Sequence, residues 1–242
     1  MIRNRGTARV RRSRNEEGER KDRPPRISHV LTFFCSSLLP IALAAGGCAT
    51  ATSHEERHYI LEAVREGNAV RPARVGSLEV LRFSVDTAFA GKNLIYRLGE
   101  LQYEADYYHQ FLVAPGIMIT EKTRRWLADS GLFHNVVPVG TRIAADYTLE
   151  GNVTALYGDF ANESAPVAVM EVRFFLLENA GGGENAVFAE TYKAASPVPS
   201  RAADDFIDAM NRSLVEILGR LETDLQKVLA GKTEAAGNSR NP

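Results

Sequence analysis

The segment VAVMEVRFFLL, residues 167–177, decides the fold class of this 242-residue chain together with its two neighbours. Those neighbours are ADYTLEGNVTAL at residues 145–156 and AVFAETYK at residues 186–193. All three are rich in the β-branched and aromatic residues that are typical of strands. Because they follow one another along the chain with short connections, we expect three strands that are able to pair as antiparallel hairpins.

A long amphipathic helix is predicted to follow, from Ser200 to about Ala230. Ser200 is a candidate N-cap, and Asp204 and Asp205 stand in the first turns, where the helix dipole favours negative charge. The helical spacing of the apolar residues favours packing against a sheet, with a partner helix as the alternative. The expected apolar stripe consists of Phe206, Met210, Leu214, Ile217, Leu218, Leu221, Leu225 and Val228.

Upstream of this unit, strand patterns lie at residues 78–85, 93–97 and 101–113. The segment HYILEA, residues 58–63, fits strand and helix templates equally well on its pattern alone. Side chains alternate along residues 101–113, which predicts two distinct faces. We expect one face to carry Tyr103, Ala105, Tyr107, Phe111 and Val113 and the other Glu104, Asp106, Tyr108 and Gln110.

A first helix is predicted over residues 117–130, ended by Gly131. Together these elements predict an α+β two-layer sandwich, in which two helices cover a mostly antiparallel or mixed sheet. The folded domain is expected over residues 58–230, followed by a disordered tail at 231–242. The inner stripe of the first helix is expected to contain Ile119, Thr123, Trp126 and Leu127.

The N-terminal segment has the order of a lipoprotein signal peptide: basic, apolar, small, then Cys48. Its apolar run at residues 30–45 is shorter than the roughly 20 residues that a membrane-spanning helix needs. The sequence AGGC ending at Cys48 resembles a lipobox, with Ala45 where Leu is usual. We therefore predict a signal peptide with an extended basic leader at residues 1–47. The alternatives are an ordinary secretory signal with an incidental Cys, or an uncleaved anchor.

Cleavage before Cys48 would leave a lipidated tether at residues 48–57 and no second cysteine to form a disulfide within the chain. Acyl chains on Cys48 would hold the protein to a membrane. Ala49, rather than Asp, follows the cysteine, which favours the outer membrane with the domain facing the periplasm.

Charge and motifs exclude several classes of function. Residues 1–47 hold ten Lys and Arg and four Asp and Glu, so the remaining chain has a formal charge of −7. This sign gives no electrostatic reason to bind nucleic acid.

The glycine run at 181–183 suits a hairpin loop, because a phosphate cradle needs a following helix. No cofactor, metal or catalytic motif is found, so the sequence predicts a non-enzyme; the alternative is an enzyme whose catalytic groups come together only in space. The histidines considered as metal ligands are His54, His58, His109 and His134.

Several segments together resemble the ABC-type transport auxiliary lipoprotein family, the PqiC-like lipoproteins found beside MCE-type lipid transport systems. The resemblance covers roughly residues 58–225. It is carried by IYR ending at Arg97, the Tyr107-Tyr108 pair, SGLF at 130–133 and DYTLEG at 146–151. One departure is Phe111-Leu112, where members of the family often have Trp.

The resemblance implies that residues 58–63 form a strand and that the protein is a non-catalytic, periplasm-facing lipoprotein. It would assist an ABC-type, MCE-like system that transports lipids between the inner and outer membranes. Its partners would be an MCE-type protein and ABC transporter components, and a homo-oligomer is possible. The alternative is an outer-membrane assembly or structural lipoprotein that acts on lipopolysaccharide, pili or cell wall.

Overall fold

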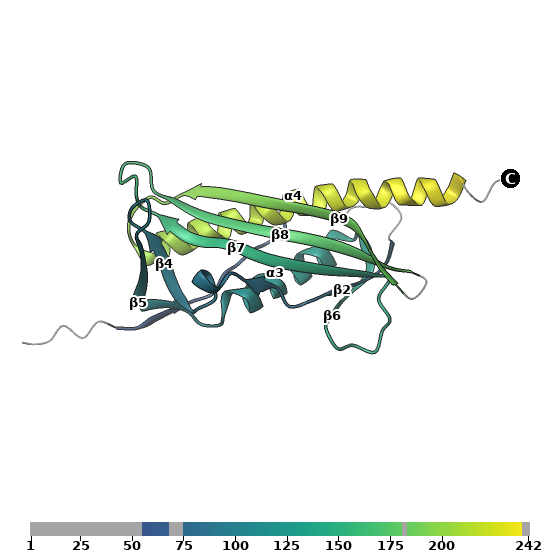
Figure 1. Ribbon diagram of the computed structural model, residues 1–242, viewed down its shortest axis with the longest axis horizontal. Coiled ribbons are helices and arrows are strands. Elements are labelled where there is room, and N and C mark those ends of the chain that lie inside the picture. Colours follow the sequence, from purple (N-terminus) through teal and green to yellow (C-terminus); the bar gives the residue numbers. More distant parts are fainter. Residues whose placement is uncertain (1–54, 68–74, 181–182, 239–242) are drawn as a thin grey trace, which may run out of the picture. The chain divides into compact units, whose positions relative to one another are not determined.

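The computed structural model describes residues 55–67, 75–180 and 183–238 (Figure 1). The expected signal peptide, most of the tether and Cys48 lie outside these residues. The described residues all belong to one compact unit. Its elements are β1 (Arg57–Tyr59), β2 (Val75–Val80), β3 (Ser84–Val85), η1 (Thr87–Phe89), β4 (Asn93–Arg97), β5 (Tyr103–Phe111), α3 (Pro115–Ser130), β6 (Phe133–Pro138), β7 (Tyr147–Asp159), β8 (Val167–Ala180), β9 (Gly183–Pro197) and α4 (Ala203–Asn238).

The sheet is organised around β7, which has a different kind of partner on each edge. On one edge, β7, β8 and β9 form the expected antiparallel unit. On the other edge, three short strands pair in parallel with successive parts of β7: β2 at its start, β3 in its middle and β4 at its end. Strand β6 extends the sheet from β2, and β5 and then β1 extend it from β4. The prediction of a mixed sheet in an α+β fold is therefore confirmed.

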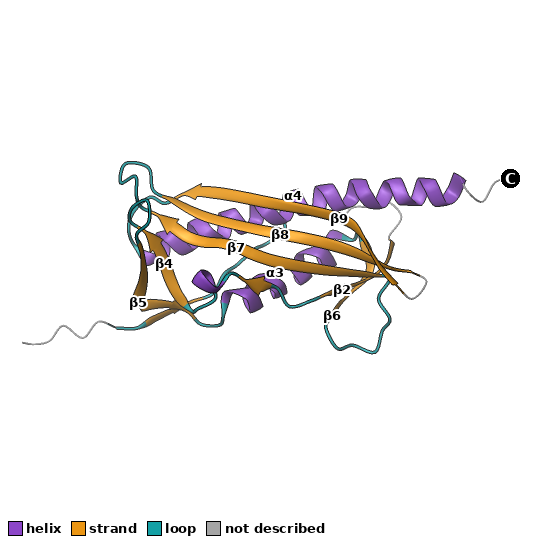
Figure 2. Ribbon diagram, in the orientation of Figure 1, coloured by secondary structure: helices purple, strands orange, loops and turns teal. Residues whose placement is uncertain are grey.

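The two helices pack on the inner face of this sheet, which curls around them (Figure 2). Along β8, every second side chain from Ala168 to Leu176 is buried against α4. Burial of a Leu or Phe side chain contributes about 1.5–3 kcal/mol, so this layer supplies much of the stability. The predicted stripe of α4 is confirmed, with all its residues buried except Val228, which is partly buried. The four residues predicted for the inner stripe of α3 are buried as well.

Helix boundaries match the prediction at one end of each helix better than at the other. Gly131 adopts φ 75° directly after α3, a conformation that favours glycine, so the predicted helix end is confirmed. Helix α4 begins at Ala203, and the Ser200 hydroxyl accepts a hydrogen bond from the Ala202 N–H. The expected helix end near Ala230 is too early, because α4 continues to Asn238 through most of the predicted tail. No helix of the described residues is long and apolar enough to cross a membrane.

The shorter strands need three corrections. The strand expected at 58–63 is limited to β1. The strand expected at 78–85 is divided into β2 and β3, because the chain between them turns Phe83 inward onto Gly151 and Phe174. Strand β6 was not predicted at all. Its sequence, FHNVVP, has no clear alternation, and its pairing with β2 is what makes it a strand.

Candidate functional site

An apolar hollow of about 410 Å³ lies on the outer face of the sheet, where η1 meets the β4–β5 hairpin. We call this hollow the aromatic pocket. Its lining contains one charged residue, whereas a larger hollow of about 610 Å³ beside α4 is lined by three glutamates and an arginine. Binding pockets are typically apolar with few polar groups, which favours the smaller hollow as the candidate site. The aromatic pocket is lined by Ala88, Phe89, Ile95, Tyr103, Glu104 and Ala105.

Two aromatic rings, Phe89 and Tyr103, form one wall of this pocket, and a third ring, Tyr157 of β7, packs against both of them. Phe89 stacks on Tyr157 of β7 with ring centroids 5.8 Å apart and planes 22° apart. Tyr103 of β5 meets both rings edge-on, at 5.5 Å from Tyr157 and 6.5 Å from Phe89. Such pairs contribute about 0.5–1.5 kcal/mol each beyond their buried area. The wall is therefore held in place before any ligand or partner arrives.

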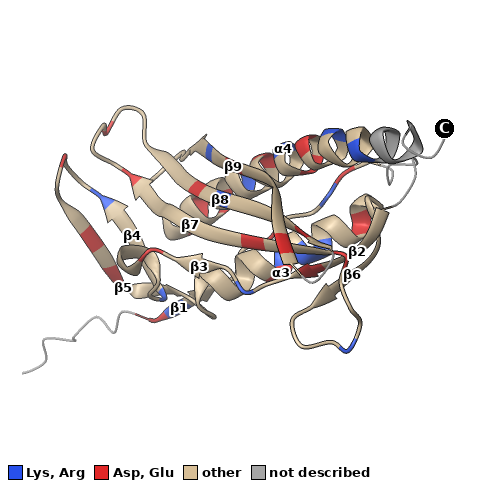
Figure 3. Cartoon of the chain, turned by 45° about the vertical axis from the view of Figure 1, so that its right-hand side comes forward, with Lys and Arg blue, Asp and Glu red and all other residues tan. Residues whose placement is uncertain are grey.

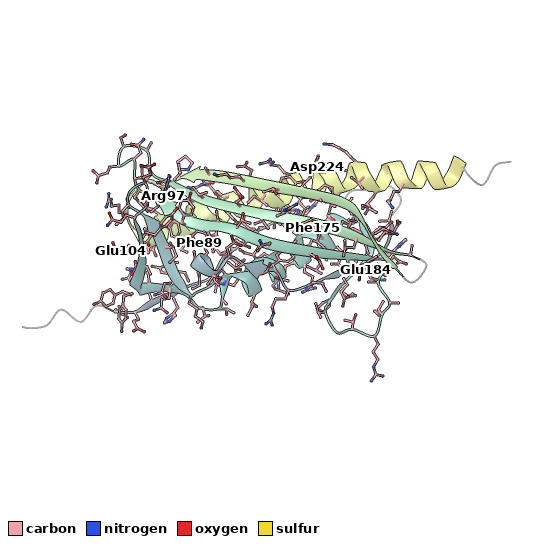
Figure 4. All side chains as sticks on the ribbon, in the orientation of Figure 1. Phe89, Arg97, Glu104, Phe175, Glu184 and Asp224 are labelled. Carbon is pink, nitrogen blue, oxygen red and sulfur yellow. The ribbon has the colours of Figure 1, made fainter. Side chains whose placement is uncertain are left out.

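Local backbone structure explains how Phe89 reaches this wall. The Asp86 N–H donates to the Val153 carbonyl, which fastens the start of η1 to β7. The Phe89 N–H then donates to the Asp86 carbonyl at 2.8 Å, and this tight turn directs Phe89 back toward the sheet. Figure 4 shows Phe89, Arg97 and Glu104 at the same end of the sheet.

Arg97 of β4 packs beside this cluster of rings. Its guanidinium lies 5.7 Å from the centroid of the Tyr157 ring and forms an ion pair with Asp159. The hydrogen bond from Arg97 holds the pKa of the Asp159 carboxyl below its usual value, although burial opposes this shift. Because Asp159 already neutralises this arginine, the pocket is not an anion site. It offers apolar and aromatic surface, with the Glu104 carboxylate at its rim.

The Arg97–Asp159 pair predicts a pH-dependent contribution to stability. The folded pKa of Asp159 is depressed, so its contribution is complete above the unfolded pKa of about 3.9 and is lost as the pH falls through the folded value. We expect Asp159→Asn to lose less stability than the wild type between about pH 6 and pH 3 in urea titrations. Glu163→Gln, which alters a side chain that is 82% exposed, serves as the control and should retain the wild-type pH dependence.

Strand β5 differs from its predicted pattern, because most of its side chains are exposed on both faces. A bulge interrupts its pairing with β4 between the pairs Asn93–Gln110 and Ile95–Ala105. One oxygen of Asp106 accepts the N–H groups of Tyr108 and His109, at 2.9 and 3.0 Å. The other lies 2.8 Å from His109 Nδ1. The expected two-faced alternation is therefore wrong here, because the bulge changes the facing of the residues that follow.

Of the four histidines considered as metal ligands, three lie in the part of the chain that the structure describes. His54 lies outside the described residues, His58 and His134 are exposed, and His109 pairs with Asp106. Among the residues that the structure describes, no group of three or more His, Cys, Asp or Glu side chains could hold a metal ion. The glycine run belongs to a hairpin, as predicted, because Ala180 pairs with Gly183 across the turn from β8 to β9.

Sequence reasoning did not find the aromatic pocket. Phe89 stands alone in a polar segment, and Tyr157 and Asp159 were beyond the predicted end of their strand. For the bulge in β5 one local signal was available, because an Asp side chain often accepts the backbone N–H two residues on, as Asp106 does from Tyr108. The contacts of Phe89 and Arg97 with β7 join residues about 60 positions apart, and no local pattern predicts them.

The curled mixed sheet, the two helices on its inner face and the outer apolar pocket place this chain among small α+β domains. More narrowly, the family model of the ABC-type transport auxiliary lipoprotein component matches residues 59–222, and the chain belongs to this family. The matched range begins in β1 and ends in α4, so it contains every part of the candidate site.

Solved structures agree with this fold. A Xanthomonas campestris protein of the DUF330 family superposes with a TM-score of 0.65 at 19% identity, covering 74% of this chain and 99% of its own. An uncharacterized protein of known structure gives a TM-score of 0.56 at 14% identity, covering 71% of this chain and 99% of its own. At these identities the likeness concerns the fold. No curated protein matches the sequence.

Proposed function

We propose that this protein is the lipid-anchored auxiliary component of an ABC-type, MCE-like system that transports lipids between the inner and outer membranes. The observation that carries the proposal is the family match over residues 59–222, which spans nearly the whole folded unit. In this role the protein is not an enzyme and works by binding other components of the system. It is attached to the outer membrane through Cys48 and faces the periplasm.

The aromatic pocket is the proposed contact for an MCE-type protein or another transporter component. Its rings are packed in advance, so an apolar side chain of a partner would bury surface without the cost of ordering the site. Tyr103 is 48% exposed, and Glu104 adds a carboxylate at the rim that favours a partner with a basic group beside its apolar one. Aromatic residues that present both ring and hydroxyl are enriched in protein interfaces.

The anchor is tested by labelling with a fatty acid analogue and by membrane fractionation. We expect Cys48→Ala to lose the label and either to appear in the soluble fraction or to remain as an unprocessed precursor. Cys35→Ala is the matched control, because Cys35 lies in the segment predicted to be removed. Unchanged labelling of Cys48→Ala would contradict the lipid anchor.

The partner is tested by photo-crosslinking in cells from position 103, with a benzophenone side chain in place of Tyr103. We expect a covalent adduct with an MCE-type protein, a permease or an ATPase, identified by mass spectrometry. The control position is Thr223, which is exposed on α4 and should give no such adduct. Adducts only with proteins of lipopolysaccharide, pilus or cell-wall assembly would overturn the transport role.

A further inference from the structure

A second exposed apolar surface lies where β1 meets the end of β5, outside the aromatic pocket. We call it the β1–β5 patch and define it as Ile60, Tyr107, Tyr108 and Leu112. Their exposed fractions are 49%, 68%, 37% and 53% respectively. Exposed apolar side chains that gather in one place indicate an interaction surface, whereas single ones need no explanation.

Backbone pairing and a ring contact bring the members of the patch together in two neighbouring pairs. Strand β1 runs parallel to β5, with Arg57 opposite His109 and Tyr59 opposite Phe111. The Leu112 N–H donates to the Tyr59 carbonyl at 2.8 Å, so Ile60 and Leu112 leave this pair of strands side by side. The rings of Tyr107 and Tyr108 meet edge-on, with centroids 5.2 Å apart, and directly precede His109, which pairs with Arg57 at the start of β1.

The two tyrosines are held outward by the bulge in β5. Besides the Asp106 contacts described above, the Asn93 side-chain amide donates to the Asp106 carbonyl at 2.7 Å. The Gln110 side-chain amide donates to the Tyr107 carbonyl at 3.1 Å. Because several side chains hold the backbone here, displaying the tyrosines costs little ordering when they bind.

The charges around the patch are mixed and close to balanced. Arg57 is exposed in β1, and the Lys92 ammonium donates to the Leu112 carbonyl at 2.9 Å. Glu55 and Glu56 precede β1, while the Asp106 carboxylate contacts His109. Exposed tyrosines in surroundings without a strong net charge suit the boundary between lipid headgroups and acyl chains, where an amphipathic ring finds both an apolar and a wet side.

The patch is close in sequence to the predicted lipid anchor, so the membrane is the surface that lies within its reach. Arg57 follows Cys48 by nine residues, and a chain of that length spans at most about 30 Å. Figure 3 shows β1 beside β5 at the end of the sheet where the described chain begins, and the loop between β6 and β7 at the other end. A lipid on Cys48 would keep a membrane within reach of the patch, so that even a weak affinity would be sufficient.

We propose that the β1–β5 patch rests on the phospholipid surface to which the lipid anchor attaches the chain, and so fixes the orientation of the domain on its membrane. This inference depends on the lipid anchor of the proposed function. Orientation matters because attachment through the anchor alone would leave the aromatic pocket free to point in any direction. Contact at the patch would place the β4–β5 hairpin, which carries the pocket, beside the membrane surface.

The test uses the mature lipoprotein, purified from membranes and reconstituted into vesicles of phosphatidylethanolamine and phosphatidylglycerol that contain a brominated phosphatidylcholine. Tyr108→Trp places a fluorophore in the patch, and bromine quenches tryptophan on contact. Val139→Trp is the matched control, because Val139 is 55% exposed in the loop after β6. Trp126 is buried and contributes the same background to both variants.

We expect the fraction of emission quenched to be at least about twice as large for Tyr108→Trp as for Val139→Trp. Adding Ile60→Ser and Leu112→Ser to Tyr108→Trp should remove this difference. Equal quenching of the two tryptophan variants in protein that floats with the vesicles would overturn the inference while leaving the anchor intact. Protein that does not float with the vesicles would contradict the anchor itself. If the tryptophan at position 108 is shielded from bromine only after a transporter component is added, the patch would be assigned to a protein partner instead.

Discussion

Replacement of Glu222 by Leu is expected to lower the free energy of unfolding by about 3–5 kcal/mol, because it leaves a buried guanidinium without its carboxylate. Arg65 binds both oxygens of Glu222, with Nε at 2.9 Å and Nη2 at 2.7 Å. The Trp126 Nε1–H donates to the same carboxylate at 2.7 Å. The side chains of Arg65 and Glu222 are only 9% and 11% exposed, so water cannot replace these contacts easily.

The Glu222 contacts join three segments that are far apart in the sequence. They fasten the chain after β1 to both helices, and the Glu62 N–H adds a hydrogen bond to Asn211 Oδ1 at 2.8 Å. Urea unfolding followed by far-ultraviolet circular dichroism measures the effect. Glu216→Leu is the control, since Glu216 is 53% exposed and its pair with Arg220 is worth less than about 1 kcal/mol. A loss for Glu222→Leu no larger than that of the control would contradict the expected role.

A second large effect is expected at Gly151, which lies in β7 beneath the Phe83 ring. A Cβ atom at this position would lie 2.6 Å from the ring, closer than atoms in proteins approach. Phe83 has no simple escape, because its ring is buried and meets Phe174 edge-on at 5.6 Å. We therefore expect Gly151→Ala to destabilise the domain by about 1–3 kcal/mol, as other overpacked cores are destabilised.

Gly219→Ala provides a matched control, for which the expected change in stability has the opposite sign. Gly219 lies inside α4, and a Cβ atom there would meet only the edge of Trp126 at an ordinary 4.0 Å. Alanine favours a helix over glycine by about 1 kcal/mol, so this variant is expected to be more stable than the wild type. Thermal and urea unfolding of both variants show directly whether each substitution lowers or raises the stability relative to the wild type. A neutral Gly151→Ala would mean that Phe83 is not confined as the structure shows.

The candidate site and the start of the folded unit lie at the same end of the sheet. Phe89 and Tyr103 line the aromatic pocket and pack on Tyr157, and β1 pairs with the strand that carries Tyr103. With the proposed lipid anchor on Cys48, this arrangement would present the proposed partner site close to the membrane. The loop between β6 and β7 and the C-terminal part of α4 lie at the other end (Figure 1).

The sequence by itself determined those features that depend on neighbouring residues. The period of the apolar residues predicted the buried stripe of α4, Gly131 predicted the end of α3, and three apolar runs predicted the β7–β8–β9 unit. Each of these features is a local one, since a side chain's face in a helix or strand follows from its position along that element. The same kind of pattern predicts the lipid on Cys48, which stays a prediction.

Only the tertiary structure decided how the shorter segments are arranged. Strands β2, β3 and β4 pair in parallel with one edge of β7, and their order along it is set by contacts between residues about 60 positions apart. The bulge at Asp106 changed the directions in which the side chains of β5 face, although the sequence alternates there. The aromatic pocket and the Glu222 contacts depend on these arrangements, because a hydrogen bond or ring contact between distant segments exists only once packing has brought them together.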